Sequence, residues 1–309
     1  MVYGKELLSY DFGPNHYMNA KRLISFFEAV QSSSLLTDRR ISVLNPRKAT
    51  REELALYHDE TYIGFVKKAS ERGTGLLDYG DTPVFPGIFE AASYVVGSSL
   101  AALDAVMKGE VTYSMNPMGG MHHARKNRAA GFCVFNDVGV IIEKSRREYG
   151  LARILYVDLD AHHGDGVMYD YYDDPNLYIA DFHEDGRYLY PGTGFTDETG
   201  GSNAAGTKLN LPLRPGARDA EFLDKFQTMK EFVSALSVDL TIVQAGVDSI
   251  AGDLSHLDLT MNSHLAVISF LKKRAASSSK GPLIVLGGGG YNPRNTSAVW
   301  LSIVKNLIG

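Results

Sequence analysis

The stretch ILYVDLDAHHGDG, residues 154–166, decides the fold and indicates where a site lies. Its first four residues are apolar, which is typical of a strand buried on both faces in a parallel sheet. Side chains alternate in an extended chain, so Asp158, Asp160 and His162 are expected to project to one side as the strand ends. Two carboxylates and an imidazole that converge in this way can bind a metal. The alternative for this stretch alone is a capped loop with solvated charges.

Short apolar runs alternate with longer segments of helical period along the rest of the chain, which predicts a βαβ organisation. The expected core strands are residues 111–115, 153–158, 177–182, 240–245 and 283–286. The expected helices are residues 16–31, 51–57, 61–72, 87–109, 137–149, 220–236, 260–277 and 295–307. Residues 275–282 are expected to be a helix end and a short loop rather than a linker. The sequence therefore predicts an α/β fold, with one domain over residues 1–309, a mainly parallel central sheet and helices on both faces.

Composition excludes several classes of protein. A chain of 309 residues with 44% hydrophobic content can bury a large core, and a net charge of −5 gives no general attraction to nucleic acid or anionic membrane. The single cysteine, Cys133, excludes an intrachain disulfide and a cysteine-based zinc cluster. We see no signal peptide and no apolar stretch long enough to span a bilayer. We therefore expect a cytoplasmic protein with no nucleic-acid or membrane partner, of undetermined oligomeric state.

Polar and glycine-rich segments follow each expected strand. These segments are residues 117–125, 160–165, 183–194, 246–253 and 287–292. Sites in open α/β sheets lie at the carboxyl ends of the strands, so these loops are expected to meet in one composite site.

Asp248 is the candidate for a third metal ligand beside Asp160 and His162. It leaves an apolar strand through a small residue, much as Asp160 does. Two carboxylates and one imidazole leave a position open for water and a substrate carbonyl, which is typical of a catalytic metal site. A two-metal ureohydrolase would need a further aspartate nearby, but Ser249 and Ile250 follow Asp248.

The adjacent histidines His122 and His123 follow a Gly-Gly turn after an expected strand. Imidazole is the usual side chain for proton transfer near neutral pH. Each histidine needs a carboxylate to orient it, and Asp158 and Asp165 are both available for this.

A run of glycines, residues 287–290, precedes Tyr291. A phosphate-binding glycine loop is the generic alternative, but no Gly-Lys-Ser/Thr follows and the spacing of a dinucleotide fingerprint is absent. Glycines adopt backbone conformations closed to other residues. They would let Tyr291 reach over a metal and donate its phenolic proton to an oxyanion.

Several motifs occur in a fixed order along the chain. They are GGMHHA at 119–124, GFCVFND at 131–137, DLDAHHGDG at 158–166, YPGTG at 190–194, AGVDSIAGD at 245–253 and GGGGYN at 287–292. With these motifs the chain resembles the zinc-dependent histone deacetylase superfamily, which includes bacterial and archaeal acetoin-utilisation proteins and acetylpolyamine amidohydrolases. The resemblance runs from about Gly13 to Trp300, nearly the whole chain.

The resemblance implies the arginase–deacetylase fold and a Zn²⁺ held by Asp160, His162 and Asp248. Fe²⁺ is compatible with the same mixed carboxylate–imidazole ligands. The implied reaction is hydrolysis of the amide of acetyl-lysine, or of a similar acetylated amine, by water activated on the metal.

The resemblance also implies a role for each neighbouring polar group. His123 is the main general base and acid, and Asp165 orients it. His122, paired with Asp158, is an electrostatic partner. Tyr291 polarises the carbonyl and holds the oxyanion.

Residues farther from the metal have implied roles in binding. Gly131, Phe132 and Tyr190 line the tunnel for the alkyl chain of the substrate. Asp81 accepts hydrogen bonds from the substrate backbone, and Arg22 lies near an internal channel for acetate release. A K⁺ ion is also implied, bound through Asp158, Asp160, His162 and backbone carbonyls after the next strand, near Asp181 and Phe182.

The chain departs from the family pattern in places. Met121 stands where many relatives have Trp, Tyr190 replaces the commoner Phe, and Leu254 follows Asp253 where Pro is usual. The acetylpolyamine branch often has an acidic residue near the Leu254–Ser255 position; none stands there in this chain, although Asp253 and Asp258 are close in sequence. No departure removes a proposed ligand, so we expect an active enzyme.

Three other functions remain open at this point. The chain is compatible with an acetylpolyamine or small acylated-amine amidohydrolase, an arginase-like ureohydrolase, or a catalytically silent protein that binds acetylated ligands. Protein acetyl-lysine, acetylpolyamines, longer acyl chains and small metabolites all fit the same core.

Overall fold

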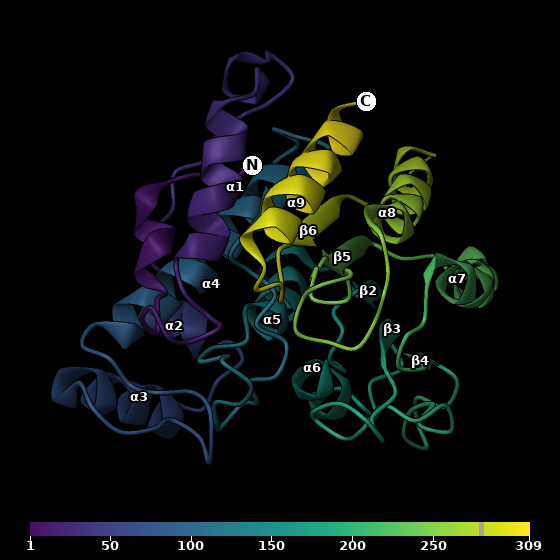
Figure 1. Cartoon of the computed structure of the whole chain (residues 1–309). Helices are drawn as coiled ribbons and strands as arrows, with labels where there is room; N and C mark the ends of the chain where they lie inside the picture. Colours follow the sequence, from purple (N-terminus) through teal and green to yellow (C-terminus); the bar gives the residue numbers. More distant parts are fainter. Residues whose placement is uncertain (278–280) are drawn as a thin grey trace.

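The computed structural model describes residues 1–277 and 281–309, and its strands form one parallel sheet (Figure 1). The strands are β1 (Tyr113–Asn116), β2 (Ile154–Asp158), β3 (Leu177–Glu184), β4 (Lys208–Leu213), β5 (Leu240–Gln244) and β6 (Leu283–Leu286). Their order across the sheet is β1-β6-β5-β2-β3-β4, and every pair of neighbours is parallel. The predicted α/β class with a parallel central sheet is therefore confirmed.

Helices cover both faces of this sheet. The α-helices are α1 (Lys21–Gln31), α2 (Arg51–Leu54), α3 (Glu60–Arg72), α4 (Ile88–Met107), α5 (Asp137–Tyr149), α6 (Asp165–Asp170), α7 (Asp219–Ser234), α8 (Met261–Ala276) and α9 (Pro293–Ile308), and short 3₁₀ turns form η1 (Lys5–Ser9) and η2 (Leu35–Thr37). Parallel crossovers are right-handed, so connections that run in opposite directions along the sheet lie on opposite faces. Accordingly α4 packs against α5, whereas α8 packs against α7 and α9, and α1, α9 and α8 lie side by side in Figure 1.

The direction of the connections reverses between β2 and β5, which are neighbours in the sheet. Asp158 at the end of β2 is paired with Gln244 at the end of β5. The chain leaves β2 through α6 and leaves β5 through α8, on opposite faces. Such a switch point opens a crevice at the carboxyl ends of the strands, where ligands bind in open α/β sheets.

Local sequence explains where the helices beside this crevice begin. Asn136 caps α5 by accepting a hydrogen bond from the Gly139 amide over 2.9 Å, and Asn292 caps α9 by accepting from the Arg294 amide over 3.0 Å. Asparagine is among the preferred N-cap residues, and Pro293 fits the first turn because its missing N–H would have no helical partner there.

Several predicted boundaries were wrong. The helix predicted at 16–31 begins only at Lys21, because residues 14–18 form a turn and a bend, and the helix predicted at 51–57 ends at Leu54. Strand β4 was missed because Pro212 interrupts its apolar pattern, although proline is tolerated on an edge strand such as this one. Helix α6 was also missed, because it is too short to show a helical period in the sequence.

Two expectations concern the remaining segments. The loop predicted within 275–282 lies partly outside the described residues, at 278–280. Within the described residues, none of the helices has the length and apolar character that a membrane crossing requires.

Candidate active site

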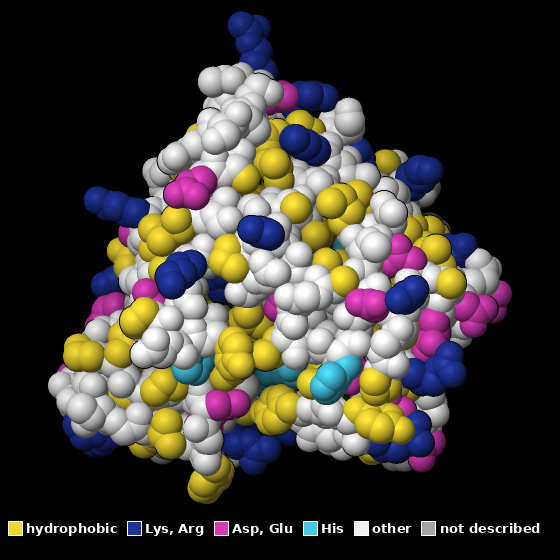
Figure 2. Space-filling model, viewed as in Figure 1, with side chains coloured by type: hydrophobic (Ala, Val, Ile, Leu, Met, Phe, Trp, Pro, Cys, Tyr) yellow, Lys and Arg dark blue, Asp and Glu magenta, His cyan; other side chains and the backbone are white. Residues whose placement is uncertain are grey.

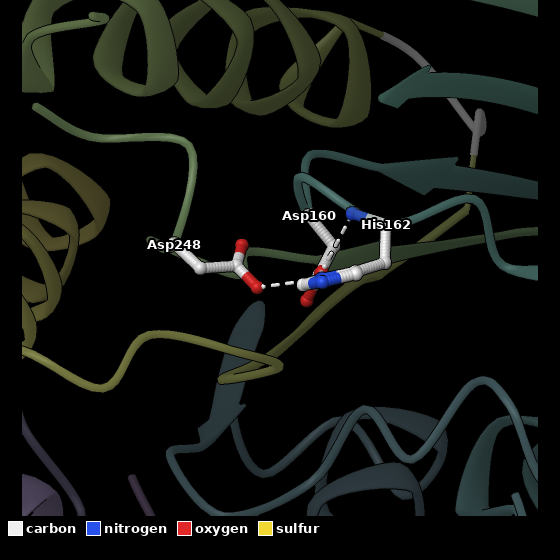
Figure 3. Close-up of side chains that lie close together, drawn as sticks. All are labelled: Asp160, His162 and Asp248. Carbon is white, nitrogen blue, oxygen red and sulfur yellow. Dashed lines mark hydrogen bonds and ion pairs between the residues drawn. The ribbon is translucent and has the colours of Figure 1, made fainter. Parts of the chain in front are cut away.

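Three buried side chains from the ends of β2 and β5 converge at the crevice (Figure 3). Asp160 and His162 come from the loop after β2, and Asp248 comes from the loop after β5. His162 Nδ1 lies 3.0 Å from Asp160 Oδ1 and 3.0 Å from Asp248 Oδ2. One donor atom from each residue lies within 4.8 Å of the other two. The structure thus brings together the three predicted metal ligands.

The charges of this group fit a bound cation. Burial raises the pKa of Asp248 to about 7, and the nearby Asp160 carboxylate adds to the shift. Burial alone would lower the pKa of His162, but its hydrogen bonds to both carboxylates raise it to about 10. The group therefore retains protons near neutral pH, because two buried carboxylates need positive charge between them. A divalent metal supplies that charge, and oxygen and imidazole donors suit zinc or iron.

Two glycines make room for the carboxylates of Asp160 and Asp248, the proposed metal ligands. A side chain at Gly289 would overlap the carboxylates of both Asp248 and Asp160, and one at Gly246 would overlap Asp160. The Gly289 amide also donates to Asp160 Oδ2 over 2.7 Å. The glycine run after β6 therefore serves close packing against the ligands as well as backbone freedom.

The adjacent histidines lie beside these ligands, and each contacts its own carboxylate. His122 Nδ1 lies 2.7 Å from Asp158 Oδ2, and His123 Nδ1 lies 2.7 Å from Asp165 Oδ1. The Nε2 atoms of the two histidines are 3.1 Å apart. Tyr156 donates a further hydrogen bond to Asp158 over 2.6 Å. These are the same two pairs that the resemblance implies.

The two histidines differ in their affinity for a proton. Burial opposes a charge on His122, but Asp158 and Asp160 outweigh burial and raise its pKa to about 10. Burial lowers the pKa of His123 to about 4, and the charge on His122 adds to this effect. At neutral pH the pair therefore consists of a cationic His122 and a neutral His123 that can accept a proton.

Tyr291, which follows the glycine run, lies beside the two histidines. It lines a small cavity together with both histidines and Asp160. Burial raises the pKa of Tyr291 well above its usual value, and Asp248 and Asp160 raise it further. The phenol therefore stays protonated and can act as a hydrogen-bond donor.

Arg22 lies buried behind this loop. Its Nε donates to the Gly290 carbonyl over 2.7 Å, and its Nη2 donates to the Gly288 carbonyl. The guanidinium carbon lies 5.5 Å from the centre of the Tyr291 ring. Arg22 thus supports the glycine loop, a contact that sequence analysis did not predict; an acetate channel beside it stays a prediction.

Aromatic side chains line the approach to the histidines. The Tyr190 ring lies 5.1 Å from the His123 ring and is 46% exposed, and the Phe132 ring lies 5.8 Å from the Tyr291 ring. Phe132 has a φ of 66°, which is uncommon for a residue other than glycine. A side chain at Gly131 would overlap His123. Gly131, Phe132 and Tyr190 therefore surround the entrance to the site.

Asp81 belongs to an exposed loop at this entrance. Its carbonyl lies 3.1 Å from His16 Nε2, and the His16 ring lies 4.7 Å from that of Phe132. The neighbouring Thr82 hydroxyl accepts a hydrogen bond from the Phe132 amide over 3.1 Å. Figure 2 shows histidine, hydrophobic and acidic side chains close together on the lower part of this face.

The expected potassium site contains an ion pair. Asp181 Oδ1 lies 2.7 Å from His183 Nδ1, and its Oδ2 accepts from the Gly164 amide over 2.9 Å. Asp181 lies beside Asp158 in the sheet, and Phe182 follows it in β3. A K⁺ ion at this place stays a prediction.

Two buried side chains that hold the site together were not predicted from the sequence. Gln244 Nε2 donates to Asp160 Oδ2 over 2.6 Å, and Asp137 accepts from the Gly120 and Met121 amides over 3.0 and 2.8 Å. Asp137 thereby fixes the turn before the histidine pair. Both residues lie within predicted elements, at the end of β5 and the start of α5, but their partners belong to other segments of the chain.

Comparison with known proteins identifies related chains. The histone deacetylase domain model matches residues 16–307. The chain is 37% identical over 319 residues to the acetoin utilization protein AcuC of Bacillus subtilis (strain 168), covering 98% of this chain and 81% of that protein. It is 35% identical over 317 residues to AcuC of Staphylococcus xylosus, covering 98% and 82%.

Solved structures agree with these sequence matches. The crystal structure of an HDAC homolog complexed with SAHA superposes with a TM-score of 0.87 at 32% identity, covering all of this chain and 83% of the other. The HDA15 HD domain superposes with a TM-score of 0.91 at 26% identity, covering all of this chain and 87% of the other. These neighbours support the predicted arginase–deacetylase fold.

Proposed function

The chain belongs to the histone deacetylase family, and we propose that it is a zinc-dependent deacetylase of acetyl-lysine or a similar acylated amine. Membership of the family supports a hydrolase that acts on an acetylated amine. The observation that carries the finer proposal is the buried group of Asp160, His162 and Asp248 beside two histidine–carboxylate pairs.

The metal would be held by these three residues. When bound, zinc supplies a Lewis acid that activates water and polarises the amide carbonyl. The carboxylates and imidazole of the protein leave a coordination position open for these reactants. The same donors accept Fe²⁺, so the metal that supports activity is part of the proposal.

His123 would move the proton that hydrolysis requires. As a neutral base it accepts a proton from water, and it then delivers a proton to the leaving amine, while Asp165 holds its ring in position. His122 stays protonated against Asp158, and its positive charge stabilises the negative charge that develops nearby.

Tyr291 would donate its phenolic hydrogen bond to the developing oxyanion. Its raised pKa keeps the proton on the phenol throughout the neutral range. A donor that is fixed before reaction stabilises the transition state without a cost of reorganisation at that moment.

Residues at the entrance would select the substrate. Gly131, Phe132 and Tyr190 would surround a linear alkyl chain, and Asp81 would accept hydrogen bonds from the substrate backbone. Arg22 would lie near the route of acetate release, with K⁺ beside Asp158. We propose that residues 1–309 act as one catalytic domain in the cytoplasm.

Hydrolysis of a fluorogenic acetyl-lysine peptide tests the proposal. Turnover is expected with Zn²⁺ supplied, to be lost on chelation and to return when metal is restored. A panel of acetylated polyamines and longer acyl-lysines run beside it identifies the preferred amine. No metal-dependent turnover of any acylated amine would contradict the proposed function, and binding without turnover would indicate a silent binder.

The Tyr291→Phe variant tests the oxyanion donor. Turnover is expected to fall by about 10²–10³-fold, while zinc content stays that of the wild type, because the phenyl ring keeps the packing and loses only the donor. Equal losses of zinc and turnover would instead show that Tyr291 has a structural role.

A further inference from the structure

Asp253 makes an unusual set of contacts with the segment that carries Tyr291. Its Oδ1 accepts a hydrogen bond from the Tyr291 amide over 2.9 Å, and its Oδ2 accepts from the Asn292 amide over 2.9 Å. Its carboxylate also accepts from the Asn295 side chain over 3.2 Å and from the Leu254 amide over 2.9 Å. One carboxylate thus holds two successive backbone amides of a loop that lies 38 residues away.

The preceding glycines are held differently, by groups of the inner scaffold. The Gly287 and Gly288 amides donate to the carbonyls of Asn116 and Gly119 over 3.0 and 2.7 Å. The Gly289 carbonyl accepts from the Val247 amide over 3.0 Å, and Arg22 binds the carbonyls on either side of Gly289. The next two backbone amides, those of Tyr291 and Asn292, donate to Asp253 instead.

Asp253 belongs to the loop that follows β5, which also contains the proposed ligand Asp248. The Ser255 hydroxyl donates to the Asp248 carbonyl over 2.7 Å. Glu184, buried at the end of β3, accepts from the His256 amide over 2.8 Å and lies 2.7 Å from His256 Nδ1. These contacts hold the loop that carries Asp253 against Asp248 and the end of β3, and they thereby fix the position of Asp253.

We propose that Asp253 is a positioning residue that aligns Tyr291 with the reacting carbonyl. Hydrogen bonds from backbone amides to a carboxylate are among the stronger ones in proteins. They fix the point at which the Tyr291 side chain leaves the backbone, and a shift of that point moves the phenolic oxygen. The proposal rests on the proposed function in so far as Tyr291 is the oxyanion donor.

The Asp253→Asn variant is the sharpest test. An asparagine side chain has one acceptor oxygen, so its amide nitrogen would face one of the two backbone N–H groups and lose that hydrogen bond. We expect kcat on the acetyl-lysine peptide to fall about tenfold, because a displacement of about 1 Å is enough for such losses. KM and zinc content should stay within about twofold of the wild type.

Asp258→Asn is the matched control. Asp258 is an exposed carboxylate of the same loop, 3.3 Å from Arg218, and makes none of these contacts. This variant should retain the turnover of the wild type. An equal loss of turnover in both variants would overturn the inference, because it would show a general effect of charge at the rim.

A double-mutant cycle separates positioning from general destabilisation. In a Tyr291→Phe background the phenolic donor is already missing, so Asp253→Asn should lower kcat by less than about twofold more. A full additive loss would contradict the inference.

Amide hydrogen exchange tests the contact without any activity. In Asp253→Asn, exchange in peptides that cover residues 287–294 should accelerate about tenfold, while peptides of β5 stay unchanged. If the wild type turned over no acylated amine, the proposed function would fail, and these exchange rates would still decide whether Asp253 holds the loop. Unchanged exchange would overturn the inference by itself.

Discussion

The interior of the site and its rim are built in different ways. In the interior, buried side chains such as Asp160 and His122 have two or more polar partners, several of them remote in sequence. At the rim, Tyr190 is 46% exposed, and the loop of Asp81 is mostly exposed to solvent. In the proposed function, the interior would carry out the chemistry, whereas the rim would select the acylated amine that reaches it.

This difference predicts how mutations act. Interior side chains sit in a low-dielectric environment, where the loss of a charge or a proton acceptor affects the reaction itself. Rim side chains would contact the substrate near water, so their loss should change substrate binding by smaller amounts. The following predictions proceed from the largest expected effect to the smallest.

Replacing the proposed ligand Asp248 with asparagine should have the largest effect. The variant loses one of the two carboxylates proposed to bind the metal. Loss of a residue that only hydrogen-bonds to a metal ligand lowers metal affinity by about 10–100-fold. Zinc affinity should therefore fall by more than that. Turnover should fall with zinc content, which can be measured by metal analysis of the purified protein. Asp224→Asn, at an exposed position on α7, is the control. A variant that keeps full zinc content would show that Asp248 is not a ligand.

Replacing His123 with alanine should leave the metal in place and remove the proton acceptor. We expect kcat to fall by about 10²–10⁴-fold with zinc content unchanged. The measurement is steady-state turnover of the zinc-loaded protein. Near-normal turnover in this variant, together with a large loss in His122→Ala, would reverse the roles of the two histidines.

Metal affinity should increase with pH. In the protein without metal, the pKa of Asp248 is raised to about 7 by burial and by Asp160, and that of His162 to about 10 by both carboxylates against the effect of burial. Zinc must displace these protons, so affinity should rise about tenfold per pH unit between 7 and 10, and more steeply below 7. Competition with a chromophoric chelator at several pH values measures this. Affinity independent of pH would contradict the account of the metal group.

Replacing Tyr190 with alanine should have the smallest effect. Loss of one aromatic wall should raise KM for the acetyl-lysine peptide about fivefold, as expected for one aromatic contact. Tyr190→Phe keeps that wall and is the control, with KM expected within about twofold of the wild type. A loss of kcat as large as that of His123→Ala would place Tyr190 in the interior of the site instead.

The sequence predicted which side chains come together in the interior, because their proximity follows from the sheet. Parallel strands end at one edge, so Asp160, His162 and Asp248 had to approach one another once β2 and β5 were neighbours. Strand geometry did not distinguish the proposed ligand Asp160 from Asp158, which pairs with His122, and that distinction came from the family resemblance.

Contacts between distant loops could not be predicted in this way. The partners of Asp253 and Gln244 lie 38 and 84 residues away, and no local pattern specifies them. The edge strand β4 was missed for a different reason, since Pro212 in its sequence argues against a strand unless its place at the sheet edge is known.

Titration of the metal-free protein with Zn²⁺, with turnover of the acetyl-lysine peptide followed at each addition, tests the central claim most directly. The proposed ligands Asp160, His162 and Asp248 would hold a single metal ion. Turnover should therefore rise in proportion to added zinc and saturate at about one ion per chain. Binding of about two ions per chain without turnover of this peptide would favour a two-metal ureohydrolase, and an absence of turnover at full metal occupancy would contradict the claim.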